Sequence, residues 1–134
     1  MCIWGGQISR IRYLGKRYGE EKERILGDAD IFVFPTYYSN ECFPLVLLEA
    51  MQHGLPCVTT EEGGIRDIVV QGSGFTVHGS SPAELTVGTA EALEKLITDA
   101  DLRKTMGEAG RKRLEEMFTE DAFEKKMKGI LTEI

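Results

Sequence analysis

Two glutamates at either end of an apolar segment are the residues of this sequence best placed to do chemistry. Glu41 lies in a polar loop, and Glu49 lies among the apolar residues of segment 44–51. Because those neighbours cover nearly every direction of a helix, the helix is expected to be largely buried. A buried carboxylate needs a partner or it loses its charge. Two interpretations of Glu49 stay open, a structural contact at the rim of the core and an acceptor for ligand hydroxyl groups.

The main chain between these glutamates offers hydrogen-bond donors. Pro44 has no N–H, which does no harm at the first position of a helix, where we expect it. The N–H groups of Phe43, Leu45 and Val46 are then free, and the helix dipole there favours an anion such as phosphate. Glu41 precedes the helix, and Glu49 lies about five residues inside it, roughly 7–8 Å along the axis at 1.5 Å per residue. This spacing matches a diphosphate plus part of a ribose, and it suits a nucleotide-sugar better than a free phosphate.

The elements that must position these groups alternate between strands and helices. Segment 31–34 is apolar on both faces and ends at Pro35, which indicates a strand covered on both sides, as in a parallel sheet. Further strands are expected at 10–14, 55–59 and 74–77, with helices at 20–26, 44–51 and 65–69. This order predicts an α/β fold with a parallel sheet.

The remainder of the chain, from Ser81 onward, has a helical pattern. We expect Ser81 to cap a first helix, Asp99 or Asp101 a second and Thr119 a third. The apolar stripes expected to face the core are Val87, Ala90, Leu93 and Leu96/Ile97 in the first helix, and Phe123, Met127, Ile130 and Ile134 in the third.

Composition narrows the class of protein. The chain has 134 residues, 42% of them hydrophobic, and a net charge of −6, which argues against a nucleic-acid binder. Its three cysteines form no CxxC pair, and no third His or carboxylate falls at a metal-ligand spacing, so neither a disulfide framework nor a metal site is expected. No apolar run approaches the roughly 20 residues of a membrane helix. A single cytoplasmic domain is the interpretation that these features favour.

Several blocks together resemble the C-terminal domain of family 4 (group 1) retaining glycosyltransferases of the GT-B fold. The blocks are Asp28–Thr36, Glu41 followed seven residues later by Glu49, Gly54–Thr60 and Gly63–Val69. The resemblance implies a Rossmann-like sheet that forms half of a GT-B fold, with C-terminal helices. It covers roughly residues 12–134.

The resemblance also assigns roles to residues. It implies that Glu41 contacts the donor sugar near the reacting carbon and that Glu49 accepts ribose hydroxyls. The amides from Phe43 to Val46 would hold the diphosphate. Lys16, Arg17 or Tyr18 would border the base, a solvated loop being the alternative for these residues. The donor would be a UDP-, GDP- or ADP-linked hexose, with no cofactor and no catalytic metal.

This sequence departs from the family pattern in two ways. Cys42 and Pro44 stand where the family usually has glycine. The family's domain also begins with two strands and helices, carrying an Arg and a Lys that clamp the diphosphate, which have no counterpart here. We therefore expect residues 1–134 to form one incomplete donor-binding domain, truncated at its N-terminal side and with little transferase activity by itself.

The same comparison suggests partners. A sugar or lipid-linked acceptor would bind through an N-terminal domain outside this sequence, so the intact protein can be cytoplasmic or peripheral to the inner face of the membrane. Strand 31–34 would have a bare edge, an association hazard. We expect the N-terminal strand to pair there or the chain to form a homo-oligomer.

Other functional classes remain as alternatives. The chain can be a non-catalytic binding or structural module, or one subunit of a split transferase. A receiver domain is disfavoured because no acidic cluster follows an early strand. A dehydrogenase half is disfavoured because the sequence has no GxGxxG motif.

Overall fold

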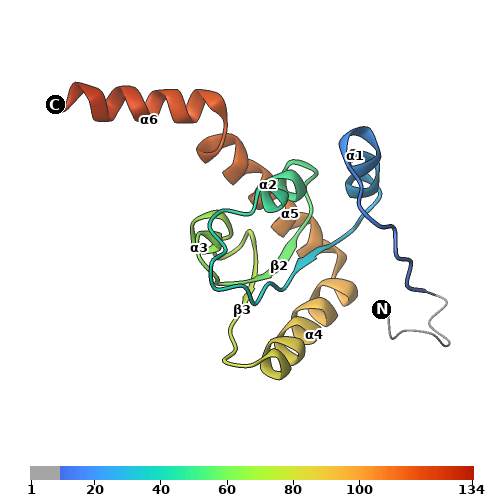
Figure 1. Ribbon diagram of the computed structural model, residues 1–134. Coiled ribbons are helices and arrows are strands. Elements are labelled where there is room, and N and C mark those ends of the chain that lie inside the picture. Colours follow the sequence, from blue (N-terminus) through green and yellow to red (C-terminus); the bar gives the residue numbers. More distant parts are fainter. Residues whose placement is uncertain (1–9) are drawn as a thin grey trace.

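A computed structural model describes residues 10–134 and shows an α/β fold (Figure 1). The described sheet contains β1 (Phe32–Phe34), β2 (Cys57–Thr60) and β3 (Gly74–Val77), all parallel and in that order. The helices are α1 (Gly19–Gly27), α2 (Leu45–Gln52), α3 (Ile65–Ile68), α4 (Pro82–Thr98), α5 (Ala100–Met117) and α6 (Glu120–Thr132). The Rossmann-like parallel arrangement predicted from the sequence is confirmed.

Strand β2 is the centre of the sheet, and all four of its residues are buried. Successive side chains on a strand point to opposite faces. Cys57 accordingly packs in a cluster with residues of α2 and α3, whereas Val58 packs in a second cluster with residues of α4 and α5. The sheet is therefore covered on both faces, which explains why apolar and small residues follow one another along its strands without alternating with charged ones.

Buried threonine hydroxyls tie β2 to the segment that leads toward α2. The Thr59 hydroxyl donates to the Phe34 carbonyl oxygen at 2.8 Å, and the Thr60 hydroxyl donates to that of Thr36 at 2.7 Å. Each bond satisfies a polar group that would be costly to bury alone. The carboxyl ends of β1 and β2 are fixed together in this way.

The predicted helix caps of the C-terminal region are confirmed. The Ser81 hydroxyl accepts from the Glu84 N–H at 3.3 Å, and the Thr119 hydroxyl accepts from the Ala122 N–H at 3.2 Å. Of the two candidates for the second helix, Asp99 is the cap, since its carboxylate accepts from the Leu102 N–H at 2.9 Å.

Helix α5 packs closely against the turn between α2 and β2. A Cβ atom added at Gly107 would lie 1.9 Å from the carbonyl oxygen of Gly54, so only a glycine fits there. Gly54 itself has φ of 69°, in the left-handed region that glycine adopts readily. The end of α2 is thus held by main-chain contact with α5.

The expected strand at 10–14 is wrong. The segment forms no strand, and the side chains of Ile11 and Tyr13 are exposed. Alternation alone does not make a strand without a neighbour to pair with, and this segment does not reach the free edge of β1. Among the described residues, β1 pairs only with β2, so the expected re-pairing of that edge is not found there. The homo-oligomer stays a prediction.

The predicted apolar stripe of α4 is confirmed in part, and that of α6 is wrong. In α4 the buried residues are Leu85, Thr89, Ala92 and Leu96, and Leu93 packs against them as predicted, whereas Val87 is exposed. Gly88 lies against Val77, where an added Cβ would be 2.4 Å from a methyl carbon. The helix approaches the sheet through this small residue, which rotates the buried face away from Val87. In α6 no residue is buried, and the helix extends away from the body (Figure 1).

None of the helices in residues 10–134 is long and apolar enough to cross a membrane.

Candidate functional site

The start of α2 lies at the carboxyl end of β1, where open parallel sheets place their ligands. Pro44 is the residue that precedes the helix, with extended backbone (φ −73°, ψ 103°), rather than its first residue as predicted from the sequence. Leu47 donates its N–H to the Pro44 carbonyl oxygen at 3.1 Å. Within residues 10–134 the N–H groups of Phe43, Leu45 and Val46 have no acceptor. The expected set of free donors is therefore present.

The turn after β2 clamps the loop that carries these donors. The Gly64 N–H donates to the Cys42 carbonyl oxygen at 2.8 Å. A Cβ atom at Gly63 would lie 1.4 Å from the Glu41 carbonyl oxygen, and one at Gly64 would lie 2.0 Å from that of Cys42. The two glycines therefore allow main chain to pack directly on main chain. The sequence analysis did not identify this contact.

Glu41 is held by its backbone and not by its carboxylate. Its N–H donates to the Tyr38 carbonyl oxygen at 3.0 Å, and the residue is half-buried. Among the described residues no hydrogen bond or ion pair engages the Glu41 carboxylate. Glu41 precedes Phe43 by two positions in this loop, and within residues 10–134 its carboxylate remains available as an acceptor.

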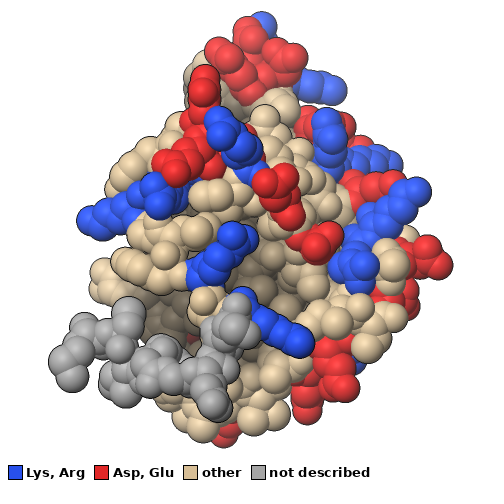
Figure 2. All heavy atoms as spheres, turned by 90° about the vertical axis from the view of Figure 1, so that its right-hand side faces the viewer, with Lys and Arg blue, Asp and Glu red and all other residues tan. Residues whose placement is uncertain are grey.

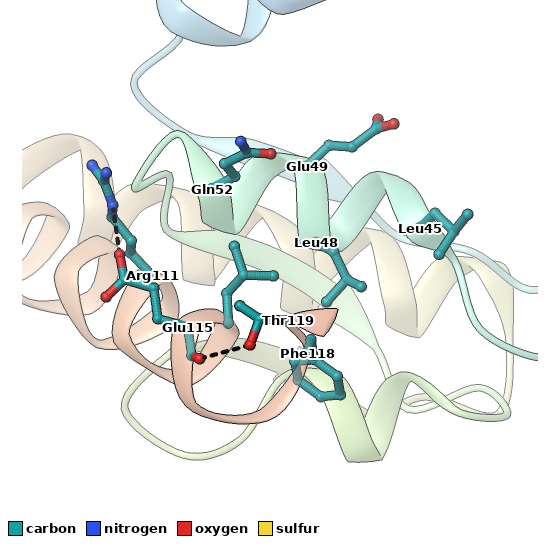
Figure 3. A pocket seen from close by; sticks show the side chains of 9 residues that line it. Leu45, Leu48, Glu49, Gln52, Arg111, Glu115, Phe118 and Thr119 are labelled. Carbon is teal, nitrogen blue, oxygen red and sulfur yellow. Dashed lines mark hydrogen bonds and ion pairs between the residues drawn. The ribbon is translucent and has the colours of Figure 1, made fainter. Parts of the chain in front are cut away.

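Glu49 has a partner that the sequence analysis did not identify. The Lys22 ammonium lies 2.7 Å from the Glu49 carboxylate, and each side chain is about one-third exposed (32% and 30%). Figure 3 shows the Glu49 side chain leaving α2 on the side away from α5. The two residues are 27 positions apart, so no local spacing could reveal the pair. The structural interpretation of Glu49 gains a definite contact, and the carboxylate still has solvent access for a second partner.

Lys16 and Arg17 are exposed and are not brought to the glutamates. Arg17 pairs instead with Glu21 at 2.9 Å, one turn along α1. Within residues 10–134 no hydrogen bond or ion pair joins either residue to the segment 41–49. Lys22, five positions after Arg17, is the basic residue of this region that contacts α2.

A cavity of about 540 Å³ lies between α2 and α5, and Leu45 and Glu49 are among its lining residues (Figure 3). Its lining mixes apolar side chains with charged and polar ones, and Arg111 pairs with Glu115 at 3.3 Å on the α5 side. Neither Glu41 nor Phe43 lines it. Phe43 instead packs edge-on against Phe118, with ring centroids 5.8 Å apart. This cavity therefore shares Leu45 and Glu49 with the predicted site and does not include Glu41 or Phe43.

A smaller polar cavity of about 220 Å³ lies at the carboxyl ends of β2 and β3. Gly63 is part of its wall, and His78 and Glu61 approach to 3.2 Å within it. Because Gly63 also touches the Glu41 main chain, this cavity adjoins the loop of the predicted site. In residues 10–134 no group of three or more His, Cys, Asp or Glu residues is placed to hold a metal ion.

The surface around the site carries charges of both signs, and one of two nearby thiols is exposed. Figure 2 shows acidic and basic side chains interspersed over the face that carries α1, with no field of one sign. The Cys42 thiol is exposed. Burial raises the pKa of Cys57 to about 12, which leaves that thiol protonated and unreactive at neutral pH.

Comparison with known proteins decides the family. The model of the family "Glycosyl transferases group 1" matches residues 6–113. The chain belongs to this family. The match includes both glutamates, the clamped loop and all three strands, so the predicted resemblance is confirmed.

Several group 1 relatives are similar to this chain. A D-inositol 3-phosphate glycosyltransferase of Corynebacterium jeikeium is 45% identical over 104 residues, which are 75% of this chain and 23% of the relative. The capsular polysaccharide biosynthesis glycosyltransferase CapM of Staphylococcus aureus is 42% identical over 91 residues, 67% of this chain and 22% of the relative. Sucrose synthase of Solanum tuberosum is 36% identical over 117 residues, 84% of this chain and 13% of the relative.

A solved structure shares the fold. Sucrose-phosphate synthase from Thermosynechococcus elongatus superposes with a TM-score of 0.64 and 27% identity, over 78% of this chain and 25% of that chain. The chain thus spans about a quarter or less of the length of each of these group 1 proteins.

Proposed function

We propose that this chain binds the nucleotide-diphosphate sugar of a hexosyl transfer that retains the configuration of the sugar. The diphosphate would accept hydrogen bonds from the N–H groups of Phe43, Leu45 and Val46. Glu41 would lie beside the sugar and Glu49 beside the ribose. Membership of the group 1 family supports a transferase. The site geometry supports the donor-binding role.

The observation that carries this proposal is the rigid row of free N–H groups between two carboxylates. Gly63 and Gly64 fix the loop by main-chain contact, so the donors are preorganised before any ligand arrives. A fixed row of donors at a helix start stabilises negative charge without the cost of reorganising solvent. Such a site would favour the leaving diphosphate as the bond to the sugar breaks.

Glu41 would act on the sugar by its charge and its hydrogen bonds. As the glycosidic bond breaks, positive charge develops on the reacting carbon and the ring oxygen. A carboxylate without a partner in the described structure can accept a sugar hydroxyl and also stabilise that charge. No nucleophile needs to come from this part of the protein for that role.

Glu49 would act on the ribose with the help of Lys22. The ammonium at 2.7 Å holds the carboxylate in one orientation, and the second carboxylate oxygen can then accept a ribose hydroxyl. Lys16 and Arg17 remain proposed neighbours of the base. They lie in the segment just before α1, the helix that supplies Lys22.

The acceptor and the full reaction lie beyond the part of the relatives that this chain spans. We propose a sugar or a lipid-linked sugar as acceptor, bound by a further domain or chain. The open edge of β1 in the described sheet favours a second candidate, one subunit of a split transferase, because an added strand there would extend the donor site. The described structure brings no Lys or Arg to residues 41–46, so we expect weak donor binding and little transfer by this chain alone.

Calorimetric titration tests the donor site. The chain is titrated with UDP, GDP and ADP and with their hexose derivatives, at concentrations up to the millimolar range. We expect saturable binding of one nucleotide, together with a loss of about tenfold or more in affinity for Glu49→Ala, because a buried hydroxyl would lose its acceptor.

Glu91→Ala is the matched control. Glu91 is an exposed carboxylate on α4, outside the cavity that Leu45 and Glu49 line. Its removal should leave nucleotide affinity unchanged. Equal losses in both variants, or no binding of any of the nucleotides, would contradict the proposed donor site.

A further inference from the structure

The aromatic ring of Phe43 is held by a residue at the end of α5. Phe43 packs edge-on against Phe118, with the ring centroids 5.8 Å apart. Phe118 follows the last residue of α5, and Figure 3 shows its side chain below α2. On the side of the turn after β2, a Cβ atom built at Gly64 would lie 3.4 Å from a ring carbon of Phe43. The ring therefore lies close both to this turn and to the end of α5.

Arg113 in turn holds Phe118. Its guanidinium carbon lies 5.6 Å from the centroid of the Phe118 ring. The same guanidinium donates to the carbonyl oxygens of Ile68 at 2.9 Å and of Asp67 at 2.5 Å. A planar guanidinium can stack on a ring and donate hydrogen bonds at the same time. Both carbonyl groups belong to α3, which begins directly after Gly64, so Arg113 ties the Phe118 ring to the turn that contacts the loop before α2.

These contacts hold the peptide group that carries the Phe43 N–H from two directions. The Cys42 carbonyl oxygen, which belongs to the same peptide group, accepts from the Gly64 N–H at 2.8 Å. In a planar trans peptide the oxygen and the N–H point in opposite directions, so the Phe43 N–H points away from Gly64. Rotation of Phe43 about this peptide group would move its ring, and the contact with Phe118 opposes that movement.

We propose that Phe118 and Arg113 are positioning residues of the diphosphate site, which direct the Phe43 N–H toward the ligand by holding the Phe43 ring. This inference rests on the proposed function, because that N–H group is one of the three proposed diphosphate donors. Leu45 and Val46 belong to α2 and are oriented by the helix itself, whereas Phe43 precedes the helix. The donor outside the helix is the one that needs a side-chain contact to fix its direction.

Backbone relaxation of the isotope-labelled chain, measured by NMR, tests this hold without any ligand. We expect the amide order parameter of Phe43 to be near the rigid value of about 0.85 in the original chain and to fall toward about 0.6 in Phe118→Ala. Phe118→Tyr keeps the ring and should keep the rigid value. Phe75→Ala is the matched control and should leave the Phe43 amide rigid. Phe75 is another half-buried phenylalanine beside a cation, with the Lys95 ammonium 5.6 Å from its ring centroid.

Nucleotide affinity tests what the hold is for. The original chain and both Phe118 variants are titrated with UDP, GDP and ADP, and the nucleotide that binds is used for the comparison. Phe118→Ala should bind it about tenfold more weakly, since a hydrogen bond to a charged group contributes about that factor or more. Phe118→Tyr and Phe75→Ala should bind it as tightly as the original chain.

A second pair of variants tests Arg113 and leaves the Phe118 ring in place. Arg113→Met should weaken nucleotide binding about threefold, as expected for the loss of one cation–π contact at a partly exposed site. Arg103→Met is its control and should leave the affinity unchanged. Arg103 also donates to two carbonyl oxygens near the end of a helix, those of Leu96 and Ile97, but that helix is α4. Circular dichroism checks that every variant retains its helices.

Two results would overturn the proposal. They are a Phe43 amide that stays rigid in Phe118→Ala, and a nucleotide affinity that falls equally in Phe118→Ala and Phe75→Ala, which would trace the loss to general destabilisation. Absence of nucleotide binding by the original chain would contradict the proposed donor site itself. The relaxation measurement would then still decide whether Phe118 holds Phe43.

Discussion

Replacing Gly107 of α5 by alanine, and Gly129 of α6 as its control, tests the close packing of α5 on the turn after α2. In a helix interior, alanine is favoured over glycine by about 1 kcal/mol. Gly107→Ala places its Cβ 1.9 Å from the Gly54 carbonyl oxygen, whereas Gly129→Ala meets no atom within 4 Å. The difference between the two variants therefore isolates the contact between α5 and the turn after α2.

The structure gives the size of that difference. The contact partner of Gly107 is main chain, which cannot move aside as a flexible side chain would. Overpacking of this kind costs about 3 kcal/mol, the upper part of the usual range. After the gain in helix propensity, Gly107→Ala should lower the free energy of unfolding by about 2 kcal/mol. Gly129→Ala should change it by between zero and about 1 kcal/mol in the stabilising direction.

Urea unfolding followed by circular dichroism measures both values, with the slope against urea checked for each variant. Nucleotide binding by Gly107→Ala shows whether the displaced turn disturbs α2. If Gly107→Ala proves as stable as the original chain, the close approach of α5 to Gly54 is refuted, together with the account of how α2 is anchored.

Three further variants test the site and the core. Gly63→Ala should displace the Glu41 main chain, because its Cβ would lie 1.4 Å from the Glu41 carbonyl oxygen and its φ is +51°. Nucleotide affinity measured by calorimetry should therefore fall at least tenfold. An unchanged affinity would contradict the main-chain contact between Gly63 and Glu41. Lys22→Met should weaken nucleotide binding about three- to tenfold by freeing the Glu49 carboxylate, while Lys112→Met, an exposed lysine of α5, should have no effect. Burial raises the pKa of Cys57 from 9.0 to about 12, so the unfolded chain loses this proton first and the free energy of unfolding should fall by about 1.4 kcal/mol per pH unit between those values. Cys57→Ala should lack that part of the slope in urea unfolding across the same range, and equal slopes would contradict burial of the thiol.

Local signals were sufficient for most elements of this fold. Strand 31–34, the helix after Pro44 and the caps at Ser81, Asp99 and Thr119 depend on nearest neighbours in the sequence, and all are confirmed. The strand expected at 10–14 had the correct alternation but no neighbour to pair with. Pairing is a property of the whole sheet, and alternation within five residues does not specify it.

The face of a helix proved harder to predict than its existence. In α4, Gly88 carries no apolar signal, yet its lack of a side chain lets the helix approach Val77 and decides which residues are buried. In α6 the spacing is that of a buried stripe, and the side chains are exposed because the described body offers them nothing to cover.

In the candidate site, too, local features were predicted from the sequence and contacts between distant segments were not. The free N–H groups follow from the position of Pro44 and were predicted, although the helix begins one residue later than expected. The Lys22–Glu49 pair and the main-chain clamp by Gly63 and Gly64 join segments more than 20 residues apart. Contacts between distant segments arise from the topology of the fold and leave no pattern in the sequence near either residue.

The clamp made by Gly63 and Gly64 has a consequence for how such a site can diversify. The two glycines contact the carbonyl oxygens of Glu41 and Cys42 and do not contact the side chains at these two positions. Those side chains can be exchanged, as cysteine stands at position 42 here, while the row of N–H groups keeps its shape. If the proposed donor site holds, selectivity for different sugars can evolve at these two positions while the N–H groups proposed to bind the diphosphate keep their geometry.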